Sequence, residues 1–391
     1  MSFRRPATLA VVALAASAAG AAEPAAVNLR LGTQAFEGLY AFTTNPPLVE
    51  IAEQIRAMGS DILKFRLAPR TGPRTPPFAP GVTSLVTLAR DEPSVRRALD
   101  MPFRHVLAWV YSFPRGRETR WTDGLSPAER ADDYAQMFDL TRHLLTNYAG
   151  TGKTFYLGHW EGDWHLLPGY GTKNATRTNP PAVRIQGMRD WLAARQQAVD
   201  DARRATPHAG VEVYHYAEVN RVRDAMKNPP DRNQRVVNAV LPFVTNLDFV
   251  SWSAYDGQDL PDDEFARTLD YIEAHLPANK AAAIRGKRVF IGEYGFGGRL
   301  PPDGQEAPTR ALMAKAVRWG CPFVLFWQMY NNEEGRHFGL VDPSGARTPC
   351  FELHRRFLAE AGVRAAAFRA RHGRDPDDRE FADLALPLLG P

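Results

Sequence analysis

The sequence predicts a single α/β domain folded as a (β/α)8 barrel of the TIM type with long βα loops. Eight strand-like segments, helical segments between them and long loops after the strands support this prediction. Strict alternation of strand and helix favours parallel pairing with right-handed crossovers, and eight such units close a barrel. The 391 residues and the hydrophobic content of 44% suit one large core.

The predicted strands are apolar runs rich in β-branched and aromatic residues. They comprise residues 29–32, 62–67, 105–110, 154–158, 211–215, 249–253, 288–292 and 323–327. An open, doubly wound sheet is the alternative arrangement. No Gly-x-Gly-x-x-Gly pattern follows the first strand, which excludes the commonest cofactor-binding variant of that sheet.

Amphipathic segments between the strands predict helices. These helices are expected at residues 47–58, 127–148, 182–204, 262–275 and 307–319. The second begins with a serine N-cap at Ser126, proline at the first helical position and Glu129 at the third. Long loops are expected at residues 68–81, 112–125, 161–180 and 218–233. All of them follow strands, on the side where barrel enzymes build their active sites.

The first 21 residues predict a secretory signal peptide. Arg4 and Arg5 precede an alanine-rich apolar stretch, and Ala19-Gly-Ala21 has the small-x-small pattern of a cleavage site. The stretch is too short to span a membrane, and no later segment is long and apolar enough. We therefore expect a monomer exported to the periplasm or outside the cell. Its barrel is expected at residues 22–362, with a tail at 363–391 that packs as a helix or frays.

Charge and cysteine content exclude several classes of partner. The formal net charge is +4, and two of these charges belong to Arg4 and Arg5. No basic run is interleaved with aromatic residues, so no nucleic-acid partner is expected. Cys321 and Cys350 lie at opposite ends of the predicted barrel and are expected to be free, buried thiols. No metal and no cofactor is expected, because no histidine pair or carboxylate cluster has ligand spacing.

Two carboxylates stand at strand ends: Glu161 in Gly158-His-Trp-Glu-Gly-Asp-Trp164 and Glu293 in Ile291-Gly-Glu-Tyr294. Hydrolysis of a glycosidic bond needs one protonated carboxyl group for the leaving oxygen and one carboxylate at the anomeric carbon. Aromatic faces suit pyranose rings. The same loops carry Trp160, Trp164, Tyr170, Tyr294, Trp327 and Tyr330.

With these residues in this order, the chain resembles the clan A glycoside hydrolases, the barrel enzymes that include cellulases, mannanases and many β-glycosidases. In that clan the acid/base glutamate follows the fourth strand and the nucleophile follows the seventh. These are the positions of Glu161 and Glu293. The resemblance implies retaining hydrolysis of a β-linked poly- or oligosaccharide by double displacement.

Further positions match the clan. Tyr255 resembles the tyrosine that hydrogen-bonds the nucleophile, Trp327 the tryptophan that floors the sugar site, and Arg66 the arginine that steadies the nucleophile. Residues 339–349 are similar to the closing loop of such barrels. One position departs: the clan usually has asparagine immediately before the acid/base, and this chain has Trp160.

Two alternatives stay open. Glu218, expected just beyond the fifth strand, is a rival for the acid/base role and otherwise lines the site. The departure at Trp160 also allows a non-catalytic carbohydrate-binding barrel. The residues expected to bind substrate are Arg66, Trp109, His159, Trp160, Asp163, Trp164, His215, Glu218, Asn220, Tyr255, Tyr294 and Trp327.

Overall fold

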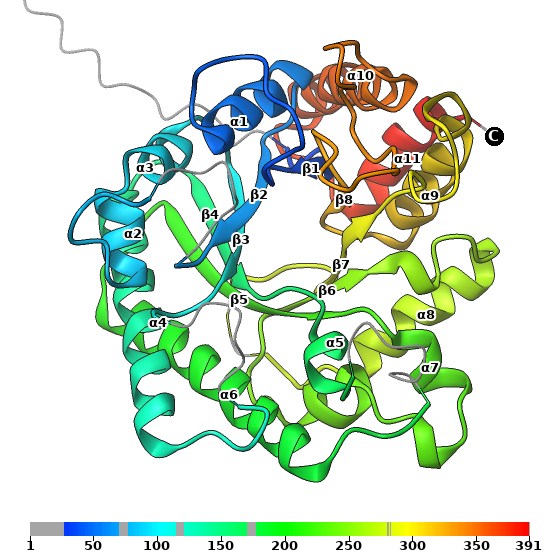
Figure 1. The fold of residues 1–391 in the computed structure, drawn as a ribbon. Helices are drawn as coiled ribbons and strands as arrows, with labels where there is room; N and C mark the ends of the chain where they lie inside the picture. Colours follow the sequence, from blue (N-terminus) through cyan, green and yellow to red (C-terminus); the bar gives the residue numbers. More distant parts are fainter. Residues whose placement is uncertain are drawn as a thin grey trace, which may run out of the picture.

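The computed structural model describes residues 27–69, 77–114, 121–169, 177–279, 281 and 283–390. These residues form a closed barrel of eight parallel strands in sequence order, surrounded by helices (Figure 1). The strands are β1 (Leu31–Gln34), β2 (Ile62–Leu67), β3 (His105–Val110), β4 (Lys153–Gly158), β5 (Val211–Val219), β6 (Phe249–Ser253), β7 (Val289–Tyr294) and β8 (Val324–Phe326). The predicted (β/α)8 barrel is confirmed. The predicted signal peptide lies outside the described residues.

The helices follow the predicted alternation. They are α1 (Pro47–Met58), α2 (Leu85–Asp91), α3 (Pro93–Asp100), α4 (Pro127–Asn147), α5 (Gly162–Leu166), α6 (Ala182–Ala205), α7 (Val222–Lys227), α8 (Asp262–Ala274), α9 (Glu306–Trp319), α10 (Pro349–His372) and α11 (Asp378–Leu389). The capping box predicted at Ser126 is present: its hydroxyl accepts from the Glu129 N–H, and the Glu129 carboxylate accepts from the Ser126 N–H. β5 is longer than expected, so Glu218 belongs to the strand and not to the loop beyond it.

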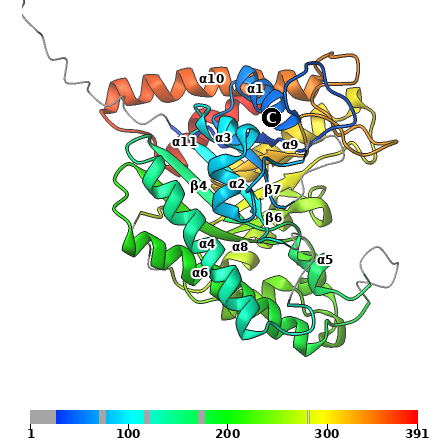
Figure 2. The same ribbon diagram turned by 60° about the vertical axis from the view of Figure 1, so that its left-hand side comes forward.

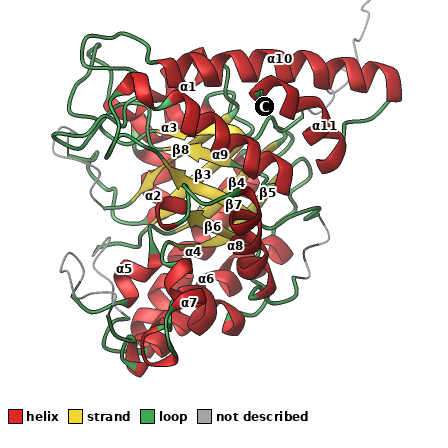
Figure 3. Ribbon diagram, turned by 90° about the vertical axis from the view of Figure 1, so that its right-hand side faces the viewer, coloured by secondary structure: helices red, strands yellow, loops and turns green. Residues whose placement is uncertain are grey.

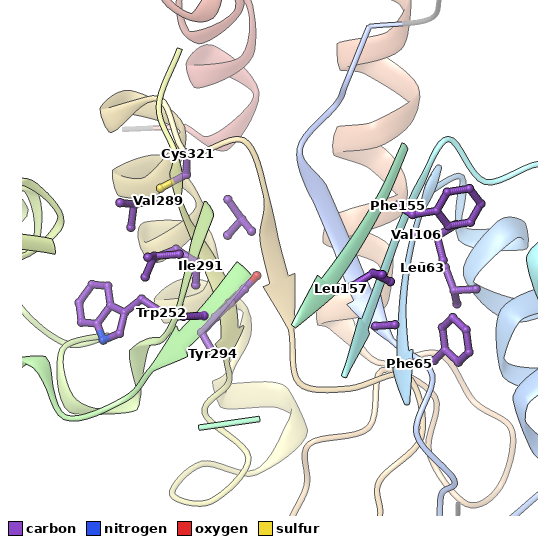
Figure 4. Close-up of a cluster of buried hydrophobic side chains, with 14 of the residues drawn as sticks. Leu63, Phe65, Val106, Phe155, Leu157, Trp252, Val289, Ile291, Tyr294 and Cys321 are labelled. Atoms are coloured by element: carbon purple, nitrogen blue, oxygen red, sulfur yellow. The ribbon is translucent and has the colours of Figure 1, made fainter. Parts of the chain in front are cut away.

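The strands bury both of their faces. Outward-facing side chains such as Leu63, Val106 and Trp252 form the outer core between the barrel and the helices (Figure 4). Inward-facing side chains such as Leu107 and Leu325 form a second core inside the barrel. This two-sided burial explains why the strands read as continuous apolar runs rather than as alternating ones.

The barrel interior changes from aromatic to polar along its axis. Near the strand starts, the Tyr156 ring lies 5.0 Å from that of Phe323 and 5.8 Å from that of Tyr214, measured between centroids. Tyr216 packs above them because Gly158 leaves room for it; a Cβ on Gly158 would lie 2.3 Å from the Tyr216 ring. These rings form a packed floor for the polar side chains at the strand C-termini.

The chain end covers the opposite side of the barrel from the long loops. α10 runs without a break across residue 362, and α11 packs against α9 and α10. α11 begins beside the barrel base, where Asp378 forms a 2.7 Å ion pair with Arg30. Figures 2 and 3 show α10 lying along the barrel, with α11 on the side away from α5.

Cys321 and Cys350 are both free and buried, as predicted. No helix within the described residues is sufficiently long and apolar to cross a membrane.

Candidate active site

A β-bulge directs Glu293 into the barrel. Ile291 pairs with Val324 of β8 and Tyr294 with Phe326, so β7 has one residue more than its neighbour over this step. Ile291 and Tyr294 both pack in the outer core, whereas the Gly292 position faces Ser251 inside the barrel. Such an insertion re-aims the side chains beside it. It leaves Glu293 with 3% of its surface exposed at the C-terminal end of β7.

The bulge also corrects one expectation. Tyr294 does not line the site: it is fully buried in the outer core, with its ring 5.4 Å from that of Phe326 (Figure 4). Simple alternation from Gly292 would turn Tyr294 inward, and the extra residue reverses its direction.

Glu161 enters the same site from the loop after β4. Its Oε1 accepts a 2.6 Å hydrogen bond from the Ser253 hydroxyl at the end of β6, and its N–H donates to Glu218 Oε1 at 2.9 Å. Burial raises the pKa of Glu161 to about 8; the Ser253 hydrogen bond opposes the rise and the charge of Glu218 adds to it. This rise favours the protonated form of Glu161 near neutral pH.

Lys64 places a positive charge among these carboxyl groups. It points inward from the middle of β2, is fully buried, and places Nζ 3.0 Å from Glu218 Oε2 and 3.8 Å from Glu293 Oε1. The ammonium also donates to the Gly292 carbonyl at 2.9 Å and lies 4.6 Å from the Trp109 ring centroid. Burial raises the pKa of Glu293, the ammonium of Lys64 opposes this rise, and the charges of Glu218 and Glu161 add to it.

Glu218 and Glu293 differ in how their oxygens are used. Glu218 accepts from Lys64 at 3.0 Å, from the Ser251 hydroxyl at 2.7 Å and from the Glu161 N–H at 2.9 Å. Oε1 of Glu293 has no hydrogen-bond donor among the described residues. Both oxygens of the Glu218 carboxylate thus accept hydrogen bonds, whereas Oε1 of Glu293 keeps its lone pairs available for reaction.

Aromatic rings line the site around these carboxyl groups. Trp109 is the centre of the group: its ring centroid lies 4.4 Å from that of Phe36, 6.1 Å from that of Trp327 and 6.4 Å from that of Trp160. Trp160 and Trp327 are half-buried and so present part of each indole to solvent. Trp164, half-buried on α5, hydrogen-bonds Glu161 through its side chain. Tyr170 lies outside the described residues.

Arg66 and Tyr255 lie at the edges of the site. Arg66 is half-buried and lines a small cavity of about 40 Å³ with Phe36 and Glu37. Tyr255 belongs to a short 3-10 helix after β6. Burial and the negative charges of Glu293 and Glu161 raise the pKa of Tyr255, which places its hydroxyl in the field of both carboxylates.

Two histidines expected in the site lie behind it. His159, directly after β4, and His215, on β5, are fully buried on the outer side of the barrel, against α6. Nε2 of His159 accepts the Glu218 N–H at 3.2 Å, and its Nδ1 lies 3.1 Å from the Trp160 carbonyl. These positions contradict direct contact with substrate, because strand alternation turns both imidazoles toward the helices. His159 supports the main chain of the site instead.

Asp163 and Asn220 form a clamp beneath the loops and do not face substrate. Asp163 Oδ2 accepts from the N–H groups of Asn220 and Arg221, each at 3.0 Å, and Oδ1 accepts from Val236 N–H at 2.8 Å. In return, Asn220 Oδ1 accepts from the Asp163 N–H at 3.1 Å. Both carboxylate oxygens are occupied, so the clamp ties α5 to the end of β5 and replaces the predicted binding role.

Replacing Asp163 with alanine is expected to lower the free energy of unfolding by about 3 kcal/mol, because three N–H groups, two of them on buried residues, lose their acceptor. Urea denaturation measures the change, and Asp231→Ala at an exposed position is the control. A loss for Asp163→Ala no larger than that of the control would contradict the clamp.

Sequence reasoning missed Lys64, Ser251, Ser253 and Phe36. A signal was present for Lys64, because a lysine within an apolar strand is almost never buried without a carboxylate partner. The serines are too common to be noticed without the register that sets them opposite Glu218 and Glu161. Within the described part of the chain, no group of three or more His, Cys, Asp or Glu side chains has a geometry that could hold a metal.

Comparisons with known proteins agree with this architecture. No protein-family model and no curated protein matches the sequence. Among solved structures, a GH5_18 protein from Bifidobacterium longum subsp. infantis has 14% identity and a TM-score of 0.51, over 92% of this chain and 78% of that one. The GH53 catalytic domain of Ignisphaera aggregans has 14% identity and a TM-score of 0.50, over 84% of this chain and 96% of that one. These structural neighbours are clan A glycoside hydrolases, and the barrel fold is shared with them.

Proposed function

We propose that this protein is a retaining glycoside hydrolase that cleaves β-linked oligo- or polysaccharides, with Glu293 as nucleophile and Glu161 as acid/base. One observation carries the proposal. The carboxyl groups that follow β4 and β7 share a single buried site, in which Glu161 is held by the Ser253 hydroxyl and Glu293 has an oxygen without a hydrogen-bond donor among the described residues. The glycoside hydrolases that share the fold support the same class of reaction.

In the first step, an oxygen of Glu293 attacks the anomeric carbon while Glu161 transfers its proton to the departing glycosidic oxygen. This forms a glycosyl ester on Glu293 and releases the leaving group as an alcohol. In the second step, Glu161 removes a proton from water, which attacks the same carbon and frees Glu293. Lys64, 3.8 Å from Glu293, favours the ionised nucleophile.

The aromatic residues are proposed to bind the sugar. Trp109, Trp160 and Trp327 surround the carboxyl groups with flat apolar faces, which pack against the C–H faces of pyranose rings. Tyr255 lies in the field of Glu293 and is proposed to hydrogen-bond it. Trp160, standing where the clan usually has asparagine, is proposed to set the preference for the sugar next to the scissile bond.

A digest of a broad panel of glycans tests the function. The mature protein should release products identifiable by mass and NMR, whereas Glu161→Gln and Glu293→Gln should not. The first product should keep the anomeric configuration of the substrate, as double displacement requires. Binding without hydrolysis across the panel would favour the non-catalytic barrel, and full activity in both variants would refute the assignment of Glu161 and Glu293.

The pH dependence of kcat/KM should be bell-shaped. Glu161 must be protonated, so activity is expected to fall as the pH rises through about 8. Glu293 must be ionised, so activity falls as the pH drops through a pKa that burial places above the ordinary 4.5. A profile measured with an aryl glycoside from pH 4 to 10 checks both limbs. An alkaline limb near the ordinary carboxyl value would contradict the protonated state of Glu161.

We also propose that the protein is exported and that residues 1–21 are removed. The charged start, the apolar stretch and the cleavage pattern support this. N-terminal sequencing of protein recovered from the periplasm or medium of an expressing bacterium should begin at Ala22. Recovery of the uncleaved chain from the cytosol would contradict export.

A further inference from the structure

We propose that Lys64 and Glu218 act together as positioning residues that set the charges of the two reacting carboxyl groups. Glu218 stays ionised and holds the Lys64 ammonium beside Glu293, while the negative charge of Glu218 keeps a proton on Glu161. This inference rests on the proposed function, since it assigns a cause to the two protonation states on which double displacement depends.

The hydrogen bonds of Glu218 show why it stays ionised. The fully buried carboxylate accepts from an ammonium, a hydroxyl and a main-chain N–H. A lysine and an amide N–H can only donate, so two of the three partners need Glu218 as an acceptor, and the ionised form satisfies all three at once. A buried carboxylate with a cation at 3.0 Å and further donors is the arrangement in which the charged form is retained. Glu218 is therefore assigned as the charged partner, and the acid role is left to Glu161.

The geometry of β6 fixes the spacing between Glu218 and Glu161. Ser251 holds the Glu218 carboxylate and Ser253 holds the Glu161 carboxyl group, and these serines are inward-facing neighbours on one strand. The two serine positions are about 6.6 Å apart along the strand. Carboxyl groups held by neighbouring serines in this way are close enough, in a buried site, for one negative charge to shift the ionisation of its neighbour by about one to two pH units.

Lys64 divides its charge between two carboxylates. Its Nζ is closer to Glu218, at 3.0 Å, than to Glu293, at 3.8 Å, and the Gly292 carbonyl fixes a third contact. Glu218 and Glu293 are the carboxylates within 4 Å of this ammonium among the described residues, so without Glu218 the ammonium would face Glu293 alone. Lys64 therefore links the state of Glu293 to the presence of Glu218.

Other groups around the cluster do not supply this effect near neutral pH. They come from β2, from β5 and from the segments after β3, β4, β6 and β8: Arg66, Tyr216, Tyr111, His159, Tyr255 and Glu333. Burial lowers the pKa of His159 to about 3 and raises the pKa values of Tyr216 and Tyr255, so these three are neutral. Arg66, Tyr111 and Glu333 are present in wild type and in every variant of the test, so a shift between the pH profiles does not arise from these residues.

The test compares pH profiles of kcat/KM for Glu218→Gln, Lys64→Met and the double variant. In Glu218→Gln, Glu161 loses its proton more readily, so the alkaline limb should move to lower pH by about one to two units. In Lys64→Met, Glu293 is harder to ionise, so the acidic limb should move to higher pH by a similar amount. The double variant removes both charges, and its limbs should lie closer to wild type than those of either single variant.

Glu212→Gln is the matched control, because Glu212 lies on the same strand about 20 Å from Glu218, near the barrel base. Its profile should coincide with that of wild type. The proposal is overturned if Glu218→Gln leaves the alkaline limb in place, or if both single variants move the limbs in the same direction. Lys64→Met leaves the Glu218 carboxylate buried without its cation and can fold poorly. Glu218→Gln and the double variant carry a neutral glutamine at position 218, so neither has an unpaired carboxylate there.

A titration that needs no turnover separates this inference from the proposed function. In protein labelled with 13C at the glutamate carboxyl carbons, Glu161→Gln and Glu293→Gln assign the two resonances. The Glu161 titration should move to lower pH in Glu218→Gln, whether or not any glycan is hydrolysed. An unmoved Glu161 titration contradicts the charge-setting pair alone, whereas an inactive wild type with the expected shift contradicts the glycosidase alone.

Discussion

Replacing Glu293 with alanine is expected to lower kcat/KM by about 10⁴-fold or more, whatever the leaving group. The substitution removes the atom that forms the covalent bond, and the described residues offer no substitute: Glu218 is held by Lys64, Ser251 and the Glu161 N–H. The measurement is steady-state hydrolysis of the aryl glycoside that wild type turns over best.

Azide provides the matching control for Glu293→Ala. It is small enough to enter the space left by the carboxylate and attack from the same side, so it should restore turnover and yield a glycosyl azide of inverted configuration. Lys64 keeps Glu218 as its ion-pair partner in this variant, so the variant should keep a cooperative thermal unfolding transition. Activity within tenfold of wild type in the folded variant would contradict the nucleophile assignment.

Glu161→Gln is expected to have an effect that depends on the leaving group. For a natural sugar leaving group, which needs a proton, kcat/KM should fall by about 10² to 10⁴-fold. For a dinitrophenyl leaving group, which departs as a stable anion, the fall should be far smaller. Glutamine can still accept the Ser253 hydrogen bond, so the change removes the proton while preserving the local structure.

The comparison of two leaving groups is itself the control for Glu161→Gln, since a merely structural defect would slow both substrates equally. Glu218→Gln should show no such dependence, because its effect acts through charge and not through proton transfer. A Glu161→Gln variant that slows both leaving groups equally, or a Glu218→Gln variant that discriminates between them, would move the acid role to Glu218.

The barrel and its two strand-end carboxylates could be predicted because both follow from local patterns. Apolar runs, helix starts such as Ser126 and the order of elements are properties of short segments. The position of Glu293 at the end of its strand was visible in the same way. The directions of side chains near strand ends were less predictable, since they depend on register.

Tyr294 shows this limit most clearly. Its direction depends on one extra residue in β7 relative to β6 and β8, and pairing with distant strands determines that bulge. His159 and His215 were placed in the site by their proximity in sequence to Glu161 and Glu218, although period-two alternation turns them outward. The sequence alone predicts that Asp163 binds substrate. In the structure its carboxylate instead accepts hydrogen bonds from the N–H groups of residues 220, 221 and 236, which are distant in sequence.

Lys64 was overlooked for a different reason. A single lysine in an apolar strand indicates that it has a carboxylate partner but not which one, and its partners Glu218 and Glu293 lie 154 and 229 residues further along the chain. Its role follows only from the closed barrel, which brings β2, β5 and β7 around one polar centre. Electrostatic partners that are this far apart in the chain are difficult to predict from the sequence alone.

Trapping the covalent intermediate is the measurement that tests the assignment of Glu293 most directly. The mature protein would be incubated with a panel of 2,4-dinitrophenyl 2-deoxy-2-fluoro-β-glycosides, which form the glycosyl ester quickly and hydrolyse it slowly. Peptide mass spectrometry should then find one fluoroglycosyl group on the peptide that contains Glu293. A label on Glu161 or Glu218, or hydrolysis with inversion and no label, would contradict the proposed mechanism.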